Sequence, residues 1–136
     1  MNKRLTTLLL AVITTACIMA QQRMLNPMRQ TDAAFFKTQE ALQIGEQILL
    51  YQRVTGGWPK NINMAKPLTD QEKAQVLQDK QRRNDSTTDN NATSMQMAYL
   101  ARLFEATKDT RFRDAFQQAV AYCSMESAIM TPNSSL

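Results

Sequence analysis

The chain has 136 residues, with 16 lysines and arginines, 12 aspartates and glutamates, and no histidine. This length provides material for one small domain. The lack of histidine excludes histidine-based catalytic triads, histidine-ligated zinc and a histidine proton shuttle. The basic residues are scattered rather than gathered into a stripe, so the sequence predicts no nucleic-acid-binding surface.

Residues 1–20 have the pattern of a secretory signal, in which a basic start precedes a short apolar run that ends at Ala20. The run is too short and too rich in threonine to predict a transmembrane span. We expect cleavage after Ala20 and a secreted or periplasmic protein. The alternative is lipoprotein processing and a lipid anchor at Cys17. Cleavage leaves Cys123 as the single cysteine, so no intramolecular disulfide framework is expected.

Residues 21–31 are polar and predict a linker, whereas residues 32–52 have a helical pattern. Asp32 is a suitable N-cap for this helix. Apolar residues recur on one face at helical spacing, at Ala41, Ile44, Gly45 and Ile48. The pair Gly56-Gly57 is expected to end the helix, and Pro59 to prevent its restart.

The turn Gly56-Gly57-Trp58-Pro59-Lys60-Asn61 contains the only tryptophan of the chain. Trp58 is either a packing residue or a platform for a flat ligand such as a sugar ring, and residue chemistry alone favours packing. Gln52, Gly56 and Trp58 also form a Gln-x-x-x-Gly-x-Trp spacing that resembles the repeated turn motif of α/α toroids. The simpler interpretation is a clamped turn between two helices.

Three further helices are expected downstream. Thr69 and Glu72 form a capping box for a mostly solvated helix that extends to about Arg83. The polar run 84–91 predicts a loop. Two amphipathic helices follow, over residues 92–107 and from Asp109 or Thr110 onward, joined closely enough to form an antiparallel hairpin. No period-2 strand pattern occurs, so the fold class is all-α.

Asp89 and Asn90 are the candidate chemical residues of the polar loop. A carboxylate beside an amide oxygen supplies the hard oxygen ligands that calcium prefers, and water or a substrate carboxylate would fill the remaining positions. The loop could fold toward Trp58 and Lys60. Two residues do not complete a metal site, however, and on spacing alone Asp89 is favoured as a cap of the helix that follows.

Three segments together resemble the N-terminal part of the family 10 pectate lyases, over about residues 41–122. The first is the turn 56–61 after an amphipathic helix. The second is 86–93, a threonine-rich stretch around Asp89-Asn90. The third is 99–107, which leads into 111–116. The domains expected from this resemblance are a truncated pectate-lyase-like α/α domain at 32–123 and a divergent tail at 124–136.

The resemblance implies a partial α/α barrel, or toroid, of antiparallel helical hairpins. It also implies calcium-assisted cleavage of polygalacturonate or pectic oligosaccharides by β-elimination. Asp89 and Asn90 would hold calcium, and Asn90, Trp58 and Lys60 would bind the substrate. Calcium would neutralise the charge that develops at the uronate carboxylate.

The base of the family is an arginine in the later half of the domain, and no arginine follows Arg113 in this chain. We therefore assign no catalytic residue and expect a truncated enzyme that is inactive alone and leaves apolar helix faces exposed. The alternative is a secreted helical module that binds acidic polysaccharide without catalysis. In that module Trp58 would stack on a sugar and Lys60 would pair with a uronate.

Overall fold

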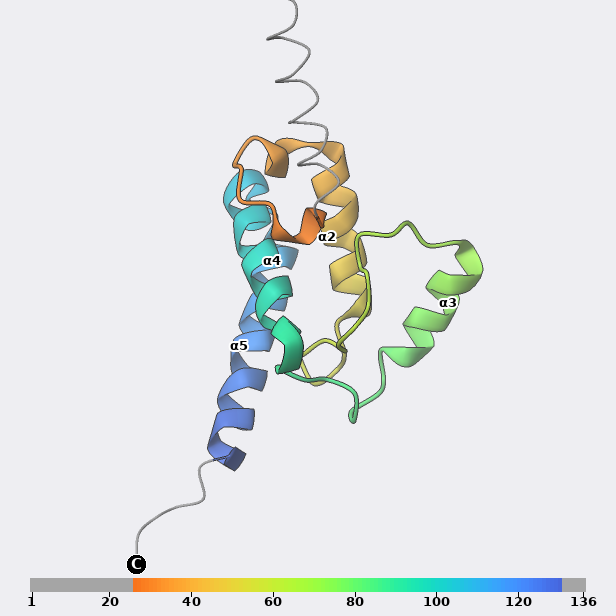
Figure 1. The fold of residues 1–136 in the computed structure, drawn as a ribbon, viewed down its shortest axis with the longest axis vertical. Coiled ribbons are helices and arrows are strands. Elements are labelled where there is room, and N and C mark those ends of the chain that lie inside the picture. Colours follow the sequence, from red (N-terminus) through yellow and green to blue (C-terminus); the bar gives the residue numbers. More distant parts are fainter. Residues whose placement is uncertain (1–25, 131–136) are drawn as a thin grey trace, which may run out of the picture.

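The structure, a computed structural model, describes residues 26–130 (Figure 1). Its helices are α2 (Gln39–Tyr51), α3 (Asp70–Asp79), α4 (Ser94–Thr107) and α5 (Thr110–Met130), with 3-10 turns η1 (Pro27–Arg29), η2 (Phe35–Lys37) and η3 (Asp89–Asn91). The described part contains no strand, only an isolated bridge between Pro59 and Ser86. The predicted all-α class is confirmed.

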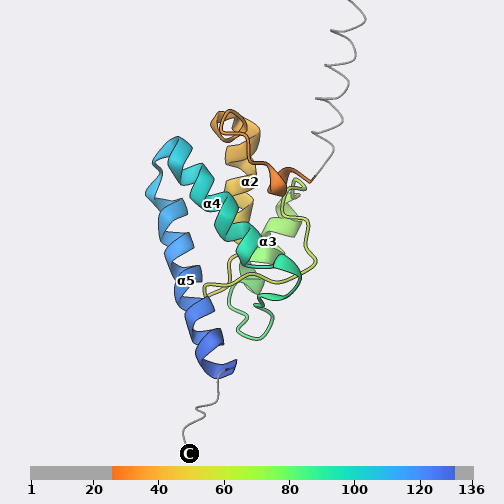
Figure 2. The ribbon, with the colours of Figure 1, turned by 60° about the vertical axis from the view of Figure 1, so that its left-hand side comes forward.

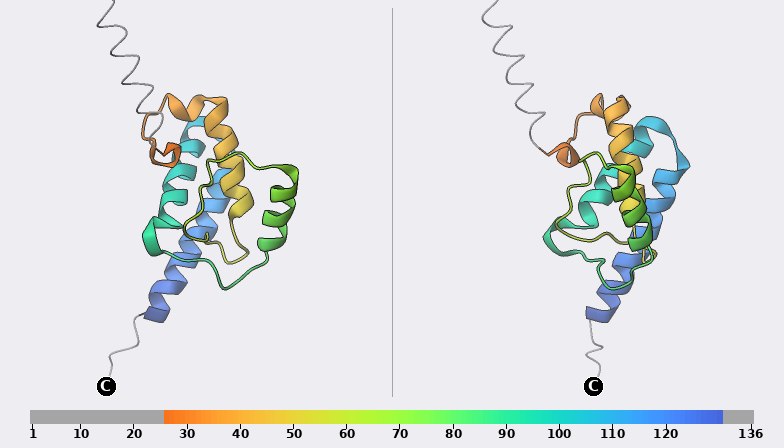
Figure 3. Two further views of the ribbon diagram at one scale, coloured as in Figure 1. Left: turned by 45° about the vertical axis from the view of Figure 1, so that its right-hand side comes forward. Right: turned by 90° about the vertical axis from the view of Figure 1, so that its right-hand side faces the viewer.

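The core lies between α2 and the hairpin of α4 and α5, whose helices run side by side (Figure 2). Leu100 and Leu103 of α4 and Phe112 and Ala119 of α5 are fully buried, on the faces that the helical spacing predicted. Gly45 lets α2 approach this hairpin, because a Cβ there would lie 3.1 Å from Cε1 of Phe112. Helix α3 packs against α2, on the side away from α4 (Figure 3).

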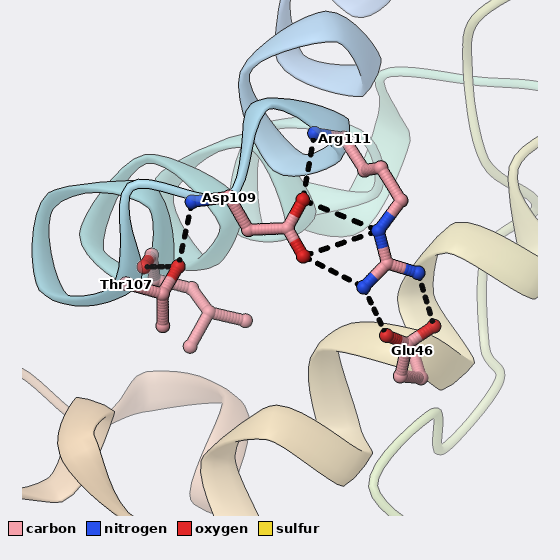
Figure 4. A network of polar contacts seen from close by, with 5 residues as sticks. Glu46, Thr107, Asp109 and Arg111 are labelled. Atoms are coloured by element: carbon pink, nitrogen blue, oxygen red, sulfur yellow. Dashed lines mark hydrogen bonds and ion pairs between the residues drawn. The ribbon is translucent and has the colours of Figure 1, made fainter.

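An ion-pair network joins the start of α5 to α2 (Figure 4). The guanidinium of Arg111 lies 2.7 Å from Asp109 Oδ2 and 2.6 Å from Glu46 Oε1. Asp109 also accepts the backbone N–H of Arg111 at 3.0 Å, so it caps the first turn of α5. Hydrogen bonds from Arg111 hold the pKa of Asp109 below its usual range. All three side chains are exposed enough for solvent to weaken the pairs, so the network mainly fixes the geometry of the hairpin.

The first described segment differs from the predicted linker and helix start. Residues 26–31 do not run free, because Met28 is buried in the core beside α4. Helix α2 begins at Gln39 instead of near Asp32, since Thr38 provides the cap by accepting the N–H of Ala41 at 3.2 Å. Asp32 instead accepts the N–H of Ala34 within a turn.

The capping box of α3 is confirmed in both directions. Glu72 N–H donates to Thr69 Oγ1 at 3.2 Å, and Thr69 N–H donates to Glu72 Oε2 at 2.7 Å. The helix ends at Asp79, before the predicted end near Arg83. Helix α4 begins two residues later than predicted, at Ser94.

The last turns of α5 extend past the other helices (Figure 1). They carry exposed apolar side chains, with exposed fractions of 65% at Met125 and 74% at Ile129. No helix within residues 26–130 is long and apolar enough to cross a bilayer. The predicted signal segment with Cys17, the start of the linker and the end of the tail lie outside the described residues.

Candidate functional site

The turn after α2 is clamped by a buried glutamine. Gln52 Nε2 donates to the carbonyl oxygens of Gly56 and of Ala115, each at 2.9 Å. One amide therefore closes the turn on itself and fastens it to α5. Gly56 has a φ of 94°, and Gly57 lies against the ring of Tyr122, with no space for a Cβ at either position. The predicted clamped turn between helices is confirmed.

Trp58 is buried in this turn, with 0% of its surface exposed. Its indole Nε1–H donates to the carbonyl oxygen of Ile48 in the last turn of α2, at 2.7 Å. A sugar-binding platform needs an open ring face, and this indole presents none. The structure therefore favours the packing alternative, in which Trp58 positions the residues that follow it.

The polar loop 84–93 lies directly against the turn, as the sequence analysis anticipated. Thr87 N–H donates to the carbonyl oxygen of Trp58 at 3.1 Å, and Trp58 N–H donates to Thr93 Oγ1 at 3.1 Å. The Thr93 hydroxyl in turn donates to the carbonyl oxygen of Thr87 at 2.8 Å. Thr93 thus ties both segments together from a fully buried position.

Backbone strain is concentrated beside Asp89. Asn90 and Asn91 have φ values of 52° and 62°, and Thr93 has a φ of 63° with a ψ of −53°. Asparagine tolerates such values, but a β-branched threonine rarely adopts them. Such strain is typically retained where a fixed loop geometry serves a function.

Asp89 and Lys60 meet across the two segments. Lys60 Nζ lies 3.2 Å from Asp89 Oδ2, and the two side chains are 45% and 68% exposed. An exposed pair of this kind contributes about 0.2–1 kcal/mol to stability. Asp89 does not cap α4, because the N-cap position is Thr93 and no side chain caps that helix. Asp89 instead begins the 3-10 turn η3.

A cavity of about 510 Å³ borders Lys60 and Asn90. We call it the amide pocket, because its lining includes the side-chain amides of Asn26, Asn61, Asn63, Asn90 and Gln96. Among the described residues of its lining, Lys60 is the one that carries a charge. Trp58 and Asp89 do not line it.

A second, more buried ion pair joins Arg53 to Asp85 of the polar loop. Arg53, 4% exposed, donates from Nε and Nη2 to the carboxylate of Asp85, with distances between 2.9 and 3.1 Å. These hydrogen bonds hold the pKa of Asp85 below its usual range. Arg53 N–H also donates to the carbonyl oxygen of Gly57. The pair therefore anchors the polar loop to the turn.

Sequence reasoning missed three of these residues: Arg53, Asp85 and Thr93. Arg53 lies at the end of an apolar helix and Asp85 in a polar run, which are ordinary places for a solvated charge. The nearest sequence signal was the run of hydroxyl and amide residues around Asp89, which indicated a structured loop without indicating its partners.

The donor chemistry at Asp89 and Asn90 suits calcium only in part. Both residues offer oxygen atoms, which calcium prefers. Within residues 26–130, no three side chains of histidine, cysteine, aspartate or glutamate are grouped to hold a metal ion. Calcium takes six to eight oxygen ligands. These residues therefore fit a calcium ion that a substrate carboxylate and water also coordinate, and do not fit a site built from protein alone.

In the comparison with protein families, residues 52–127 match the family described as pectic acid lyase. The match covers more than half of the chain, and the chain belongs to the pectic acid lyase family. It begins later than the resemblance predicted, at Gln52 instead of about Ala41, and extends beyond Tyr122 to Ser127. A comparison with curated proteins found no match.

The matched range contains the clamped turn, the Lys60–Asp89 pair and the strained loop. Membership of this family supports a lyase by resemblance and implies a polysaccharide substrate.

Proposed function

We propose that this protein is a secreted pectate lyase-type protein that binds polygalacturonate together with calcium at Asp89 and Asn90. The observation that carries the proposal is the meeting of Lys60 and Asp89 beside the amide pocket, inside the matched family range. One cation and one anion at a pocket edge suit a uronate, whose carboxylate can pair with Lys60 directly and with Asp89 through a shared cation.

The chemistry proposed is β-elimination, in which a base removes the proton α to the uronate carboxylate. When bound, calcium would supply positive charge that stabilises the negative charge developing at that carboxylate. Lys60 contributes a second positive charge. The strained loop holds Asp89 and Asn90 in place before substrate arrives, which lowers the cost of orienting the uronate. Trp58 contributes by fixing the turn that carries Lys60.

We further propose that these residues bind substrate without supplying the base, and that the helices form part of an α/α toroid. No arginine of the described segment lines the amide pocket. Arg53, Arg111 and Arg113 are each paired with an acidic side chain. Exposed apolar residues at the end of α5 support the toroid, because further helical hairpins would cover them.

Isothermal titration with trigalacturonate, with and without calcium, tests the proposal. We expect calcium-dependent binding that Asp89→Ala abolishes. Asp114→Ala is the matched control, since Asp114 is also an exposed carboxylate paired with a basic side chain. Absence of binding in both conditions would refute the proposal. Equal binding with and without calcium would refute the calcium site and favour a binding module.

Ultraviolet absorbance of unsaturated products from polygalacturonate tests the catalytic part. We expect no products from the 136-residue chain under conditions in which it binds the substrate. Calcium-dependent product formation would show that a base is present and would overturn the proposed division between binding and catalysis.

A further inference from the structure

The amide pocket has the size of a ligand site but is not explained by the Lys60–Asp89 pair. Ligand pockets typically measure about 300–1,000 Å³, and this cavity measures about 510 Å³. It extends from Lys60 to the segment that contains Asn26 and Met28, which lies before the matched family range. A uronate carboxylate bound at Lys60 would leave most of this space vacant.

Several amides of the pocket have unused hydrogen-bonding capacity. The side chains of Asn61 and Asn90 form no hydrogen bond within residues 26–130, although both backbones are held at positive φ. Among the described residues, Asn26 and Asn63 use only Oδ1, which accepts the N–H groups of Met28 and Ala65, and neither NH₂ group has a partner there.

Gln96 provides a buried polar group without a partner. The residue is 3% exposed and lines the pocket. Its Oε1 is buried and has no hydrogen-bond partner in the described part of the chain, while Nε2 lies 3.5 Å from Sδ of Met64. An unsatisfied buried acceptor destabilises the folded protein, because it has lost its hydrogen bonds to water. The terminal torsion of a glutamine is soft, so this amide can turn to meet a hydroxyl in the cavity.

The remaining lining is apolar, with Met28, Ile62 and Met95 among its members. A pyranose ring has the matching chemistry, because its hydroxyl groups donate to and accept from amides while its C–H faces pack on apolar side chains. A second carboxylate would gain less here, since Lys60 is assigned to the neighbouring uronate and the described residues of the lining include no other charged side chain.

We propose that the amide pocket is a sugar subsite that binds a galacturonosyl residue next to the one held at Lys60 and Asp89. It recognises the ring through its hydroxyl groups rather than its carboxylate. The subsite therefore accepts a methyl-esterified residue, whereas the Lys60–Asp89 position requires a free uronate. This inference rests on the proposed function for the location of the neighbouring uronate.

Titrations with digalacturonate and trigalacturonate in calcium, on the full chain, measure the contribution of the subsite. We expect trigalacturonate to bind about fivefold to tenfold more tightly, as one or two added hydrogen bonds would provide. Asn61→Gly removes an amide and retains the positive φ. It should reduce the ratio of the trigalacturonate affinity to the digalacturonate affinity toward one. Asn91→Gly is the matched control, because Asn91 is also an asparagine at positive φ but does not line the pocket. It should keep the wild-type ratio.

Gln96→Leu provides a second variant that separates binding from folding. It should reduce the ratio of the trigalacturonate affinity to the digalacturonate affinity. The melting temperature should stay unchanged or rise, because the Oε1 that is lost has no hydrogen-bond partner within residues 26–130. A trigalacturonate that is methyl-esterified at one terminal residue should exceed digalacturonate in affinity for the wild-type protein by the same factor as unesterified trigalacturonate.

The failures of the two proposals are distinguishable. If neither oligosaccharide binds, or if Asp89→Ala binds both normally, the proposed function fails and the subsite with it. If Asp89→Ala abolishes binding but Asn61→Gly and Gln96→Leu keep the wild-type ratio, the subsite alone is overturned. The subsite would also be overturned if Asn91→Gly reduced the affinity ratio as much as Asn61→Gly, or if the esterified trigalacturonate bound no more tightly than digalacturonate.

Discussion

Lys60 and Asp89 are separated by 29 residues in the sequence, yet their side chains meet at 3.2 Å. Neither residue lies in an α-helix, and each depends on a loop for its position. The two loops are joined by the hydrogen bonds among Trp58, Thr87 and Thr93. In the substrate-free protein, the ammonium group of Lys60 therefore donates to Oδ2 of Asp89, the carboxylate that is proposed to hold calcium.

This relationship predicts opposite effects of one substitution on two ligands. Lys60→Gln removes a positive charge beside Asp89, so the weak binding of calcium expected without substrate should tighten up to about fivefold, consistent with an exposed pair. The same variant should bind trigalacturonate more weakly, because the uronate loses its cationic partner. Calcium titration and oligosaccharide titration measure the two changes separately.

Lys66→Gln is the matched control, since Lys66 is an exposed lysine that pairs with Glu72 at 3.6 Å. Neither affinity should change in that variant. If Lys60→Gln weakened the binding of calcium and of trigalacturonate equally, the Lys60–Asp89 pair would have a structural role. Competition between the ammonium group and calcium would then be disproved.

Burial of the indole predicts the behaviour of the intrinsic fluorescence. Trp58 is the only tryptophan and is 0% exposed. Iodide should therefore not quench the emission of the native protein, and should quench it after unfolding in guanidinium chloride. Trp58→Phe loses the bond to Ile48 and leaves a cavity, so it should reduce the free energy of unfolding by about 3 kcal/mol. Strong quenching of the native protein would contradict the packing role and restore the sugar platform.

The buried guanidinium of Arg53 makes its partner important for stability. Asp85→Asn leaves this charge without a counter-ion, and we expect a loss of about 3 kcal/mol, the lower end for a buried pair. Chemical denaturation measures the loss. Asp114→Asn, which removes the partner of the exposed Arg113, should cost less than about 0.5 kcal/mol. If Asp85→Asn and Asp114→Asn reduced the free energy of unfolding equally, Arg53 would have to be well hydrated.

The same pair predicts a dependence of stability on pH. Arg53 lowers the pKa of folded Asp85, so the unfolded chain binds a proton more readily. The stabilisation is complete above the ordinary aspartate pKa of about 3.9 and is lost as the pH falls through the lower folded pKa. Wild type and Asp85→Asn should therefore converge in stability as the solution is acidified. If the free energies of unfolding of wild type and Asp85→Asn differed by the same amount at all pH values, the stabilising ion pair of Arg53 with Asp85 would be disproved.

Local signals made much of the helical framework predictable. The capping box at Thr69 and Glu72 and the apolar spacing of α4 and α5 depend on residues a few positions apart, so the sequence shows them directly. The predicted start of α2 is wrong because Asp32 and Thr38 are both suitable caps, and nothing in the local sequence distinguishes them.

The site depends on contacts that no local pattern encodes. The hydrogen bond from Gln52 to Ala115 joins residues 63 positions apart, and the pair of Arg53 with Asp85 joins residues 32 apart. The expected cap role of Asp89 is wrong, because Thr93 holds the N-cap position of α4, and the Asp89 carboxylate pairs with Lys60 of another loop. The burial of Met28, in a segment that resembled a linker, also depends on a distant partner, helix α4.

The contact between the glycine turn and α5 allows a final prediction about what holds the site together. A Cβ added at Gly57 would lie 2.7 Å from Cε1 and 2.8 Å from Cδ1 of Tyr122, and 3.0 Å from Cβ of Ser86. Tyr122 is buried, with 7% of the residue exposed. Gly57→Ala should therefore reduce the free energy of unfolding by about 2 kcal/mol, as overpacking typically does. Chemical denaturation measures this loss.

A double-mutant cycle with Tyr122→Leu identifies the cause of that loss. Leucine lacks the ring atoms that the new methyl group would meet, so Gly57→Ala should cost at least about 1 kcal/mol less in the Tyr122→Leu background than in wild type. Because the turn carries Lys60, Gly57→Ala should also weaken trigalacturonate binding, and Tyr122→Leu should partly restore it. An equal cost in both backgrounds would assign the loss to the backbone of the turn, and α5 would then not be what positions Lys60.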